Sequence, residues 1–384
     1  MNDLSGKAVA VVGAGVSGLS AARRLQARGA TVTIFERNDY VGGRTKSIRK
    51  DGFIFDCGAL VMLPTYKNVF AFIKELGIEA HIHEMKLRLA IVRDGKRHAF
   101  DYKAPLRTAA GMQLLSWGSK LKLLKLLPVL TKNWSLFNYR SMGDLAPLDH
   151  ESTRDYCLRV LNEEIDDYLA NPFIRINSLT DTHSAPAGEW LWQLWAYQAP
   201  VIFELDKGMV FYAENLAKGL DIHLNTAVTK VDIDQHQALV SWTGADGAQT
   251  RRFDACIVAT PPTFAKQIAP CVTPQQQRYF DAIEPVQMIS LHVGLDYLPD
   301  VEDAIVMFPE KEHPHLLDIV FDHIKGPGRA PAGCGAIAIQ TTREWSAAHA
   351  HCSDEEIVEA LATLAEPHVG PIRGHIKTTH VNRW

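Results

Sequence analysis

The chain has 384 residues, 47% of them apolar and 22% charged, which is enough for two or three domains with their own cores. The formal net charge of −4 provides no long-range attraction to nucleic acid, so the expected partner is a small molecule. The six cysteines are widely spaced without a CxxC pair, and neither a signal-peptide pattern nor an apolar run of membrane-spanning length occurs, which predicts a reduced, cytoplasmic protein.

The N-terminal residues have the pattern of a strand, a glycine-rich turn and a helix. Residues 8–12 are wholly apolar, as expected of a strand buried on both faces of a parallel sheet. The turn Gly13-Ala-Gly-Val-Ser-Gly18 follows, and then a predicted helix over 19–28 that ends at a glycine. A second strand is predicted over 31–35, directly before Glu36. This order is that of a dinucleotide-binding unit.

The glycines of this turn have separate roles in such a unit. Gly13 permits the tight turn, Gly15 lets the backbone approach a pyrophosphate, and Gly18 lets helix and strand pack closely. The acid at the end of the second strand accepts hydrogen bonds from ribose hydroxyls, and its charge disfavours the 2′-phosphate of NADP. NAD and FAD remain alternatives at this point, and so does a glycine-rich turn without a ligand. The candidate cofactor-binding residues are Gly13, Gly15, Val16, Ser17, Gly18, Glu36 and Arg37.

The segment after the second strand favours FAD. It contains Gly42-Gly43-Arg44-Thr45 and, further on, Phe55-Asp-Cys-Gly58-Ala59. Here the sequence resembles the flavin-containing amine oxidase superfamily, which includes monoamine and polyamine oxidases, protoporphyrinogen oxidases and carotenoid desaturases. The resemblance implies that Gly42, Gly43 and Arg44 wrap the FAD pyrophosphate and ribityl chain, and that Gly58 and Ala59 lie near the flavin. A guanidinium suits phosphate oxygens and glycines admit close backbone contact, while a mobile surface loop is the alternative.

A second block of elements supports the same resemblance. A helix is predicted over 211–216, strands over 220–224 and 238–242, and a hairpin turn at 244–247. A further apolar strand from 254 ends at a Pro-Pro pair. The resemblance implies that Val228 contacts the adenine through its backbone, and that Ala259 and Thr260 close the sheet beside the cofactor.

These segments predict an α/β fold, in which a Rossmann-like FAD-binding domain with a parallel sheet carries an inserted α+β substrate domain. The FAD-binding domain is predicted over 1–95 and 205–270, and the substrate-binding domain over 96–204 and 271–384. The first part of the substrate domain reads as helical. In its second part we expect a strand over 288–295 and a helix over 354–364 that Ser353 caps.

Two segments of the predicted substrate domain have ambiguous patterns. Residues 120–130 consist mainly of lysine and leucine; we expect the leucines to pack in the core, and peripheral contact with a membrane surface is the alternative. An aromatic cluster fits a hydrophobic or aromatic substrate and the core equally. It consists of Trp190, Trp192, Trp195 and Tyr197. The histidines and cysteines lack zinc-ligand spacing, so no metal site is predicted.

Two departures from the superfamily pattern affect the expected activity. Residues 286–291 lack the lysine that monoamine and polyamine oxidases place near flavin N5, which favours the protoporphyrinogen oxidase and desaturase-like branches. The chain ends at Trp384, before the Gly-Asp segment with which members of the superfamily complete the FAD site. We therefore expect the natural chain to be longer.

With this resemblance, the sequence predicts an FAD-dependent oxidoreductase. A hydrophobic organic substrate would transfer a hydride to flavin N5, and oxygen or another acceptor would take the electrons. No catalytic side chain is identified. One alternative is a non-catalytic binding protein similar to GDP-dissociation inhibitors, which lack the complete phosphate-binding glycine set that this chain has. The other alternative is an NAD-dependent dehydrogenase, for which the Gly-Gly-Arg segment would have to be incidental.

Overall fold

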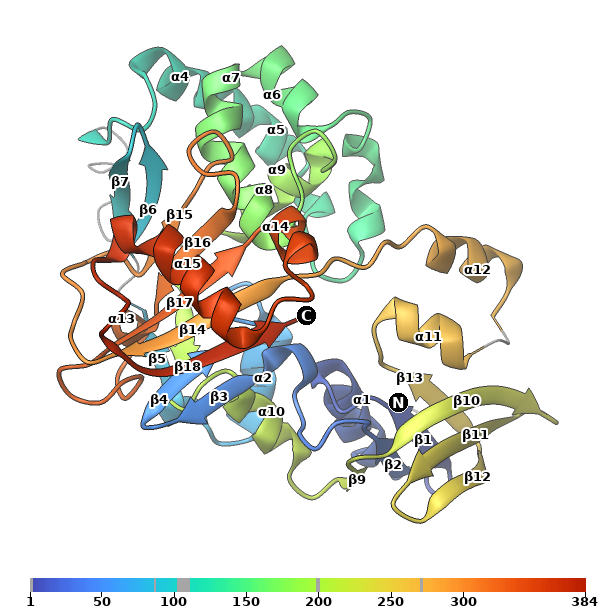
Figure 1. Cartoon of the computed structure of the whole chain (residues 1–384). Coiled ribbons are helices and arrows are strands. Elements are labelled where there is room, and N and C mark those ends of the chain that lie inside the picture. Colours follow the sequence, from blue (N-terminus) through green and yellow to red (C-terminus); the bar gives the residue numbers. More distant parts are fainter. Residues whose placement is uncertain (1–2, 86–87, 102–110, 198–200, 270–271) are drawn as a thin grey trace.

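The computed structural model describes residues 3–85, 88–101, 111–197, 201–269 and 272–384. Figure 1 shows a small parallel sheet at one end of the molecule, a larger mixed sheet in its middle and a group of helices at the other end. Within the described ranges, helices with the length and hydropathy of a bilayer span are absent.

The parallel sheet contains the predicted N-terminal unit. Its strands, in spatial order, are β13 (Ala255–Val258), β1 (Ala8–Val12), β2 (Thr31–Phe35) and β9 (Asp221–His223), and all three pairs are parallel. The predicted strands are confirmed. Helix α1 (Val16–Gln26) begins three residues earlier than predicted, because Gly15 already has extended backbone angles and serves as the N-cap.

Both faces of this sheet are covered, which explains the wholly apolar sequence of β1. Val9 and Val11 pack with α1, with α2 (Lys67–Glu75) and with α10 (Val210–Ala217). Ala10 and Val12 face a three-stranded antiparallel sheet on the other side. That sheet consists of β10 (Ala227–Asp234), β11 (Gln237–Gly244) and β12 (Gly247–Phe253). The predicted hairpin turn lies between its last two strands.

The larger sheet has seven strands and is antiparallel except for one pair. Its order is β18 (Ile376–Arg383), β14 (Ile289–Leu295), β17 (Gly335–Thr341), β16 (Leu316–Phe321), β15 (Ile305–Met307), β6 (Arg88–Arg93) and β7 (Lys96–Asp101). The predicted strand over 288–295 is confirmed as β14. Strands β6 and β7 pair across residue 95, where the sequence places a domain boundary; the division into domains stays a prediction.

The seven-stranded sheet has an outer and an inner face. The outer face packs against α14 (Arg343–Ala348) and α15 (Asp354–Val369), which begins at Ser353 with the predicted cap. The inner face packs against the helices of the inserted segment. These are α4 (Trp117–Lys122), α5 (Leu126–Lys132), α6 (Thr153–Val160), α7 (Glu163–Ile165), α8 (Asn171–Ser178) and α9 (Ala187–Ala196). The predicted helical character of 96–204 is thus confirmed for 117–196, strands occur at both ends of the range, and residues 102–110 and 198–200 lie outside the described part of the chain.

The lysine- and leucine-rich segment corrects one expectation. Leu126 is buried and Leu123 packs beside it, as predicted. Leu121, Leu124 and Leu127 are instead exposed to solvent, so the prediction that the leucines pack in the core is wrong for these three. The reason is geometric, because helical residues lying on a domain bury only one face, and this segment of α4, a 3-10 turn and α5 carries leucines on two faces.

Short elements join the two sheets. Two antiparallel pairs are formed by β3 (Ser47–Lys50) with β4 (Phe53–Asp56) and by β5 (Ile82–Glu84) with β8 (Phe203–Leu205). Three further α-helices in the described part of the chain are α11 (Pro262–Ile268), α12 (Pro274–Asp281) and α13 (Asp322–Lys325).

Candidate cofactor-binding site

The glycine turn after β1 forms a surface open to a ligand. Gly13 has a φ of +101°, and its amide donates to the Phe35 carbonyl at 2.8 Å. A Cβ on Gly18 would collide with the Gly13 carbonyl, whereas a Cβ on Gly15 would meet nothing within 4 Å. Gly18 is therefore required for packing, and Gly15 faces open space. No side chain caps α1, so the amides of its first turn, including those of Val16 and Ser17, point to that space.

The Gly-Gly-Arg segment lies against this turn. Gly42 has a φ of +106°, its amide donates to the Ala14 carbonyl at 2.8 Å, and it pairs with Gly15 as a parallel bridge. A Cβ on Gly43 would lie 3.4 Å from the Gly15 Cα. Arg44 is exposed, and its guanidinium has no hydrogen bond or ion pair to another described residue. The two glycine segments thus form one surface, and the Arg44 guanidinium beside it is free to pair with a ligand anion.

The segment around Gly58 contacts the same loop from the other side. The Ala59 amide donates to the Arg44 carbonyl at 2.9 Å, and a Cβ on Gly58 would collide with that carbonyl. The Cys57 carbonyl accepts from Trp384 Nε1 at 2.6 Å and from Asn382 Nδ2 at 3.3 Å. Strand β18 therefore reaches this loop. Sequence reasoning missed these two C-terminal side chains, because no motif links them to a loop more than 300 positions away.

Glu36 is buried at the end of β2. One carboxylate oxygen accepts from the Ala14 amide at 2.8 Å, and the other accepts from the amide and side chain of Asn38 at 2.9 and 2.7 Å. The first oxygen has one protein donor and retains a lone pair for a ribose hydroxyl. Arg37 lies over the ring of Phe264 in α11, with 4.0 Å from its guanidinium carbon to the ring centre.

The residues expected from the second block lie at the same edge. The Thr226 amide donates to the Glu36 carbonyl at 2.8 Å, which places Val228, two residues further along β10, beside the end of β2. The Ala259 amide donates to the Val12 carbonyl at 2.8 Å. The hydroxyl of Thr260 is buried and has no hydrogen-bond partner within the described ranges. All predicted cofactor-binding residues therefore gather at the carboxyl edge of the parallel sheet, where open α/β sheets bind ligands.

A buried charge cluster holds the loops of this edge in place. Asp56, two residues before Gly58, accepts from Ser47 Oγ at 2.6 Å, from the Met209 amide at 2.9 Å, from Lys325 Nζ at 2.9 Å and from Arg329 at 2.8 Å. The lysine also pairs with Asp322 at 2.9 Å, and the arginine with Glu204 at 2.8 Å. All five charged side chains are fully buried.

Two positive charges, those of Lys325 and Arg329, surround the Asp56 carboxylate. Burial by itself would raise the pKa of Asp56, but the adjacent Lys325 and Arg329 hold that pKa below its ordinary value. Burial raises the pKa of Glu204 and of Asp322 despite the same cations. The cluster connects β4, β8, α13 and the start of α10. Sequence reasoning missed it; the only local signal was Asp322 and Lys325 at helical i,i+3 spacing.

A row of buried polar side chains crosses the inner face of the seven-stranded sheet. In successive strand pairs, Asp318 is opposite Gln340, Gln340 is opposite Ser290, and Ser290 is opposite Asn382. All four are buried. Residues opposite each other in a sheet point to the same face. At one end the row reaches the Cys57 carbonyl through Asn382, and at the other it reaches Met307, the partner of Asp318.

Two groups on this face are buried without full hydrogen bonding. Asp318 Oδ1 has no partner, and burial raises the pKa of Asp318 to about 7. His292 Nε2 lies 3.2 Å from Ser290 Oγ, while its Nδ1 has no partner. Burial, with the neighbouring His380, lowers the pKa of His292 to about 3. Both groups are therefore neutral between about pH 3 and pH 7 in the folded protein.

An apolar cavity of about 210 Å³ lies between the inner face and the helices. Met307 and Ile91 form part of its floor, and Trp190, Gln193 and Tyr197 of the α9 region line its opposite wall. Trp190 Nε1 and Gln193 Oε1 are buried without hydrogen-bond partners among the residues that the structure describes. The aromatic cluster is thus divided: its first and last members line the cavity, whereas Trp192 and Trp195 pack around Tyr139.

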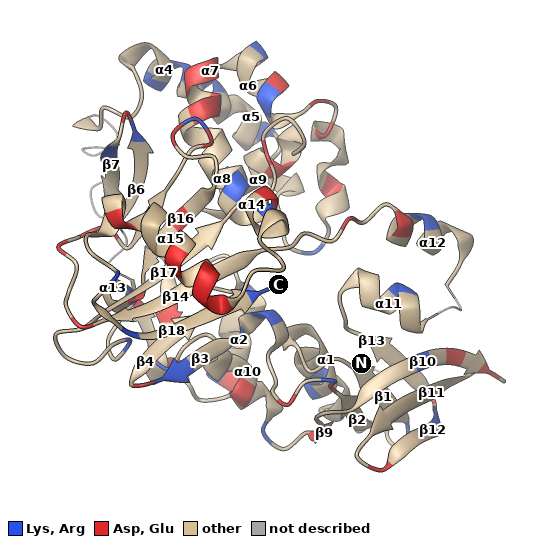
Figure 2. Ribbon diagram, in the orientation of Figure 1, with Lys and Arg blue, Asp and Glu red and all other residues tan. Residues whose placement is uncertain are grey.

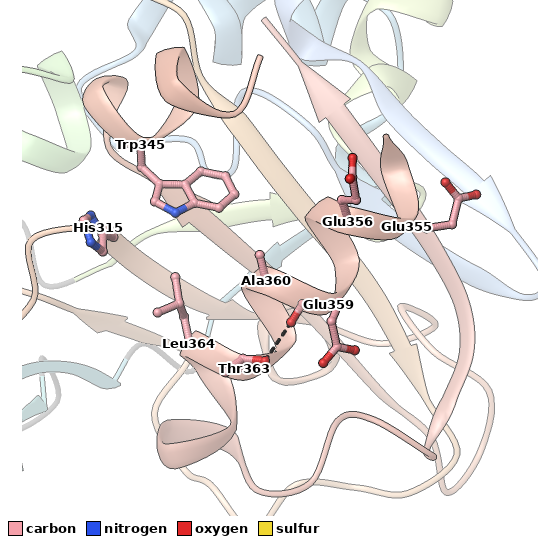
Figure 3. A pocket seen from close by; sticks show the side chains of 8 residues that line it. All are labelled: His315, Trp345, Glu355, Glu356, Glu359, Ala360, Thr363 and Leu364. Carbon is pink, nitrogen blue, oxygen red and sulfur yellow. Dashed lines mark hydrogen bonds between the residues drawn. The ribbon is translucent and has the colours of Figure 1, made fainter. Parts of the chain in front are cut away.

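The depression of Figure 3 lies on the outer face, over α15, and three of its polar side chains already have partners. Glu356 caps the helix through the Ser353 amide, and Glu359 pairs with Arg373. Thr363 donates to the Glu359 carbonyl. The part of the chain that the structure describes contains no group of three or more His, Cys, Asp or Glu side chains placed to hold a metal ion.

Comparison with known proteins agrees with this geometry. A sequence model of flavin-containing amine oxidoreductases matches residues 16–384. The chain is 28% identical to the mitochondrial protoporphyrinogen oxidase of Nicotiana tabacum over 389 residues, which covers 85% of this chain and 74% of that protein. It is 61% identical to a 4,4'-diapophytoene desaturase of Staphylococcus haemolyticus over 64 residues, which is 16% of this chain and 13% of that protein.

Solved structures share the fold. A cyclohexylamine oxidase from Brevibacterium oxydans superposes with a TM-score of 0.73 at 15% identity, covering 98% of this chain and 84% of that chain. A putrescine oxidase bound to putrescine superposes with a TM-score of 0.71 at 18% identity, with the same coverage of both chains. The likeness confirms the predicted α/β architecture. The roles of individual site residues and the cytoplasmic location stay predictions.

Proposed function

Because the chain belongs to the family of flavin-containing amine oxidoreductases and is an FAD-dependent oxidoreductase, we propose that it oxidises a hydrophobic organic substrate held in the apolar cavity. The observation that carries this proposal is the position of the cavity. Leu60 and Val61, which directly follow Gly58 and Ala59, pack against the same core cluster that forms the cavity walls. Leu60 and Val61 therefore connect the cavity, by direct packing, to the loop that contains Gly58 and Ala59.

The residues at the edge of the parallel sheet fit FAD. The uncapped start of α1 and the open face of Gly15 receive the pyrophosphate, and the Arg44 guanidinium pairs with its oxygens. The carboxylate of Glu36 binds the ribose, and the unpartnered Thr260 hydroxyl is available to the same ligand. When bound, FAD accepts a hydride from a substrate C–H bond and passes the electrons to oxygen or another acceptor.

The cavity determines what kind of substrate fits. Its lining is apolar and aromatic, and burying a substrate there excludes water. The Trp190 N–H can donate to a substrate acceptor, and the Gln193 carbonyl can accept from a substrate donor. These two groups orient a molecule that is apolar over most of its surface and carries one polar function. They do not take part in bond breaking.

The absence of a lysine from residues 286–291 bears on the reaction type. β14 begins within this segment, and its inner-face groups are Ser290 and the neutral His292. Neither supplies a positive charge to hold a water near the flavin. We therefore favour oxidation of C–H bonds in a porphyrinogen-like or polyene-like substrate over oxidation of a small primary amine. Family membership also favours an enzyme over a non-catalytic binding protein or an NAD-dependent dehydrogenase.

The proposal is tested with the complete gene product, purified with its flavin. We expect a flavin absorption spectrum that bleaches under anaerobic conditions with a porphyrinogen or a polyene, and more slowly with putrescine or cyclohexylamine. Replacing Gln193 with Leu should raise KM for the bleaching compound without loss of flavin. Bleaching by amines alone, or an unchanged KM in this variant, would contradict the proposed substrate class.

A further inference from the structure

Asp318 of β16 is a single acidic side chain in the apolar middle of the seven-stranded sheet. Strands β14, β15 and β17 contain no Lys, Arg, Asp or Glu, and β16 contains only this one, so the middle of the sheet is largely tan in Figure 2. Asp318 is 2% exposed, and its Oδ1 has no hydrogen-bond partner among the described residues. A buried polar atom without a partner costs stability, so packing alone does not account for an acid at this position.

The strand directs this side chain to the inner face of the sheet. Ile319 belongs to the core on the outer face, and Val320 belongs to the core on the inner face. Because side chains alternate along a strand, Asp318 lies on the same face as Val320. Leu316 nevertheless packs in the outer core, since the register shifts between Leu316 and Asp318. Such an irregularity re-aims a side chain and is frequent beside active sites.

Asp318 lies beside the floor of the apolar cavity. It is directly opposite Met307 of β15, which lines the cavity. Side chains that are opposite each other in an antiparallel pair have Cβ atoms about 5 Å apart. On its other side Asp318 is opposite Gln340 of β17, which belongs to the row of buried polar side chains that reaches the Cys57 carbonyl. The carboxyl group therefore lies between the cavity and the loop that contains Cys57.

The groups at this place are uncharged donors and acceptors. Burial raises the pKa of Asp318 to about 7, so below pH 7 its carboxyl group is neutral and has one O–H donor and an acceptor. The Gln340 amide also has a donor and an acceptor. An ammonium or carboxylate ligand would lose its hydration here, and a buried ion pair barely repays that loss. A hydroxyl or a carbonyl loses much less when it is buried with hydrogen bonds.

We infer that Asp318, together with Gln340, binds an uncharged hydroxyl or carbonyl group of the substrate and so determines which substrates are oxidised. This inference rests on the proposed function, which places a substrate in the cavity. The polar group that Trp190 and Gln193 orient from the opposite wall is the same group, held from the floor by Asp318. The apolar body of the substrate occupies the rest of the cavity. A buried water is the competing partner for Asp318 Oδ1.

The test is isothermal titration calorimetry of the complete, flavin-loaded gene product at about pH 6, where Asp318 is neutral. The probes are 1-decanol, decanoate and decylammonium, which have the same chain length and differ in charge. We expect decanol to bind at least tenfold more tightly than either ion. Decylammonium that binds as tightly as decanol would overturn the inference.

Two variants of Asp318 separate ligand binding from packing. Asp318→Leu keeps the branched shape without a donor or acceptor, and it should bind decanol at least tenfold more weakly. Its melting temperature should not fall, because an apolar group replaces a polar group that has no partner. Asp318→Asn retains a neutral donor and acceptor and should bind decanol within about threefold of the unmodified protein. Unchanged decanol affinity in Asp318→Leu would overturn the inference and leave a water as the partner of Asp318.

The matched control is Thr378→Val. Thr378 is buried, its hydroxyl also has no partner among the described residues, and it lies on β18, three strands away from β16. This variant should bind decanol like the unmodified protein, and an equal loss of affinity in Thr378→Val and Asp318→Leu would contradict the inference. Calorimetry requires no turnover. Decanol binding that depends on Asp318 would therefore support the inference even if neither a porphyrinogen nor a polyene bleached the flavin, in which case the proposed function alone would fail.

Discussion

The edge of the parallel sheet and the inner face of the seven-stranded sheet are assembled in different ways. At the edge, contiguous glycine segments present backbone amides, and side chains contribute little beyond Arg44 and Glu36. On the inner face, single side chains from four strands meet through strand register, as Asp318 and Ser290 do through Gln340. The proposed cofactor site, made mainly of backbone, is thus encoded locally, whereas the polar row, made of side chains, is encoded by the fold.

The largest expected effect concerns the buried cluster that joins the two regions. Replacing Arg329 with Met leaves the carboxylates of Asp56 and Glu204 without their arginine partner in a fully buried place. Breaking a buried pair in this way should lower the free energy of unfolding by about 3–5 kcal/mol. The control is Arg252→Met, which removes an exposed pair with Asp234 and should cost at most about 1 kcal/mol. Urea denaturation measures both, and equal losses would argue against the cluster as the junction.

The second prediction concerns how the free energy of unfolding depends on pH, through two buried groups on the inner face of the seven-stranded sheet. His292 has a folded pKa of about 3 against an ordinary 6.5, so its contribution to stability is lost as pH falls from 6.5 towards 3. Asp318 has a folded pKa of about 7 against 3.8, so its contribution is lost as pH rises from 3.8 towards 7. Between pH 3.8 and pH 6.5 the titrations of His292 and Asp318 change the free energy of unfolding in opposite directions.

Replacing one of the two groups should therefore reveal the pH dependence of stability that the other group contributes. Relative to the unmodified protein, the free energy of unfolding of Asp318→Asn should fall more steeply as pH decreases from 6.5 to 4, by about 1.4 kcal/mol more per pH unit, because the opposing titration of Asp318 is removed. In His292→Asn the difference from the unmodified protein should have the opposite sign. Urea denaturation at several pH values measures both. Identical pH profiles for the two variants would show that these groups are not buried as neutral species.

The third prediction distinguishes a packing role for Gly18 from a ligand-binding role for Gly15 at the carboxyl edge of the parallel sheet. Gly18→Ala should lower the free energy of unfolding by about 1–3 kcal/mol, because the new Cβ meets the Gly13 carbonyl. Gly15→Ala has no such contact and should unfold like the original, but bind FAD at least tenfold more weakly, about 1.4 kcal/mol. Flavin titration and thermal melting distinguish the two. Undiminished FAD affinity in Gly15→Ala would remove this surface from the cofactor site.

The smallest expected effect lies in the cavity. Trp190→Phe removes an N–H without a protein partner, so stability should not fall, while KM should rise by a factor that corresponds to about 0.5–1.5 kcal/mol. Trp192→Phe is the matched control, because its Nε1 donates to the Asn138 carbonyl at 3.0 Å. That variant should lose stability and keep its KM. A raised KM in Trp192→Phe and an unchanged KM in Trp190→Phe would show that the substrate does not bind in this cavity.

Sequence patterns predicted much of the fold because the relevant signals are local. The strand of residues 8–12, the Ser353 cap and the strand over 288–295 each follow from side chains a few positions apart. The residues chosen for the cofactor edge do meet at one place. The segment over 120–130 was only half predictable, because periodicity reveals that leucines line two faces but not which face the domain covers.

By itself the sequence determined the dinucleotide-binding unit, the family and the flavin cofactor, since the glycine turn and the Gly-Gly-Arg segment are short motifs of residues adjacent in the chain. Only the tertiary structure decided how Asp56, Glu204, Lys325 and Arg329 become one buried cluster, which polar side chains face the cavity, and that Trp384 contacts the loop at Cys57. These arrangements depend on strand register and on contacts between distant segments. A one-residue shift in register would turn every such side chain to the opposite face.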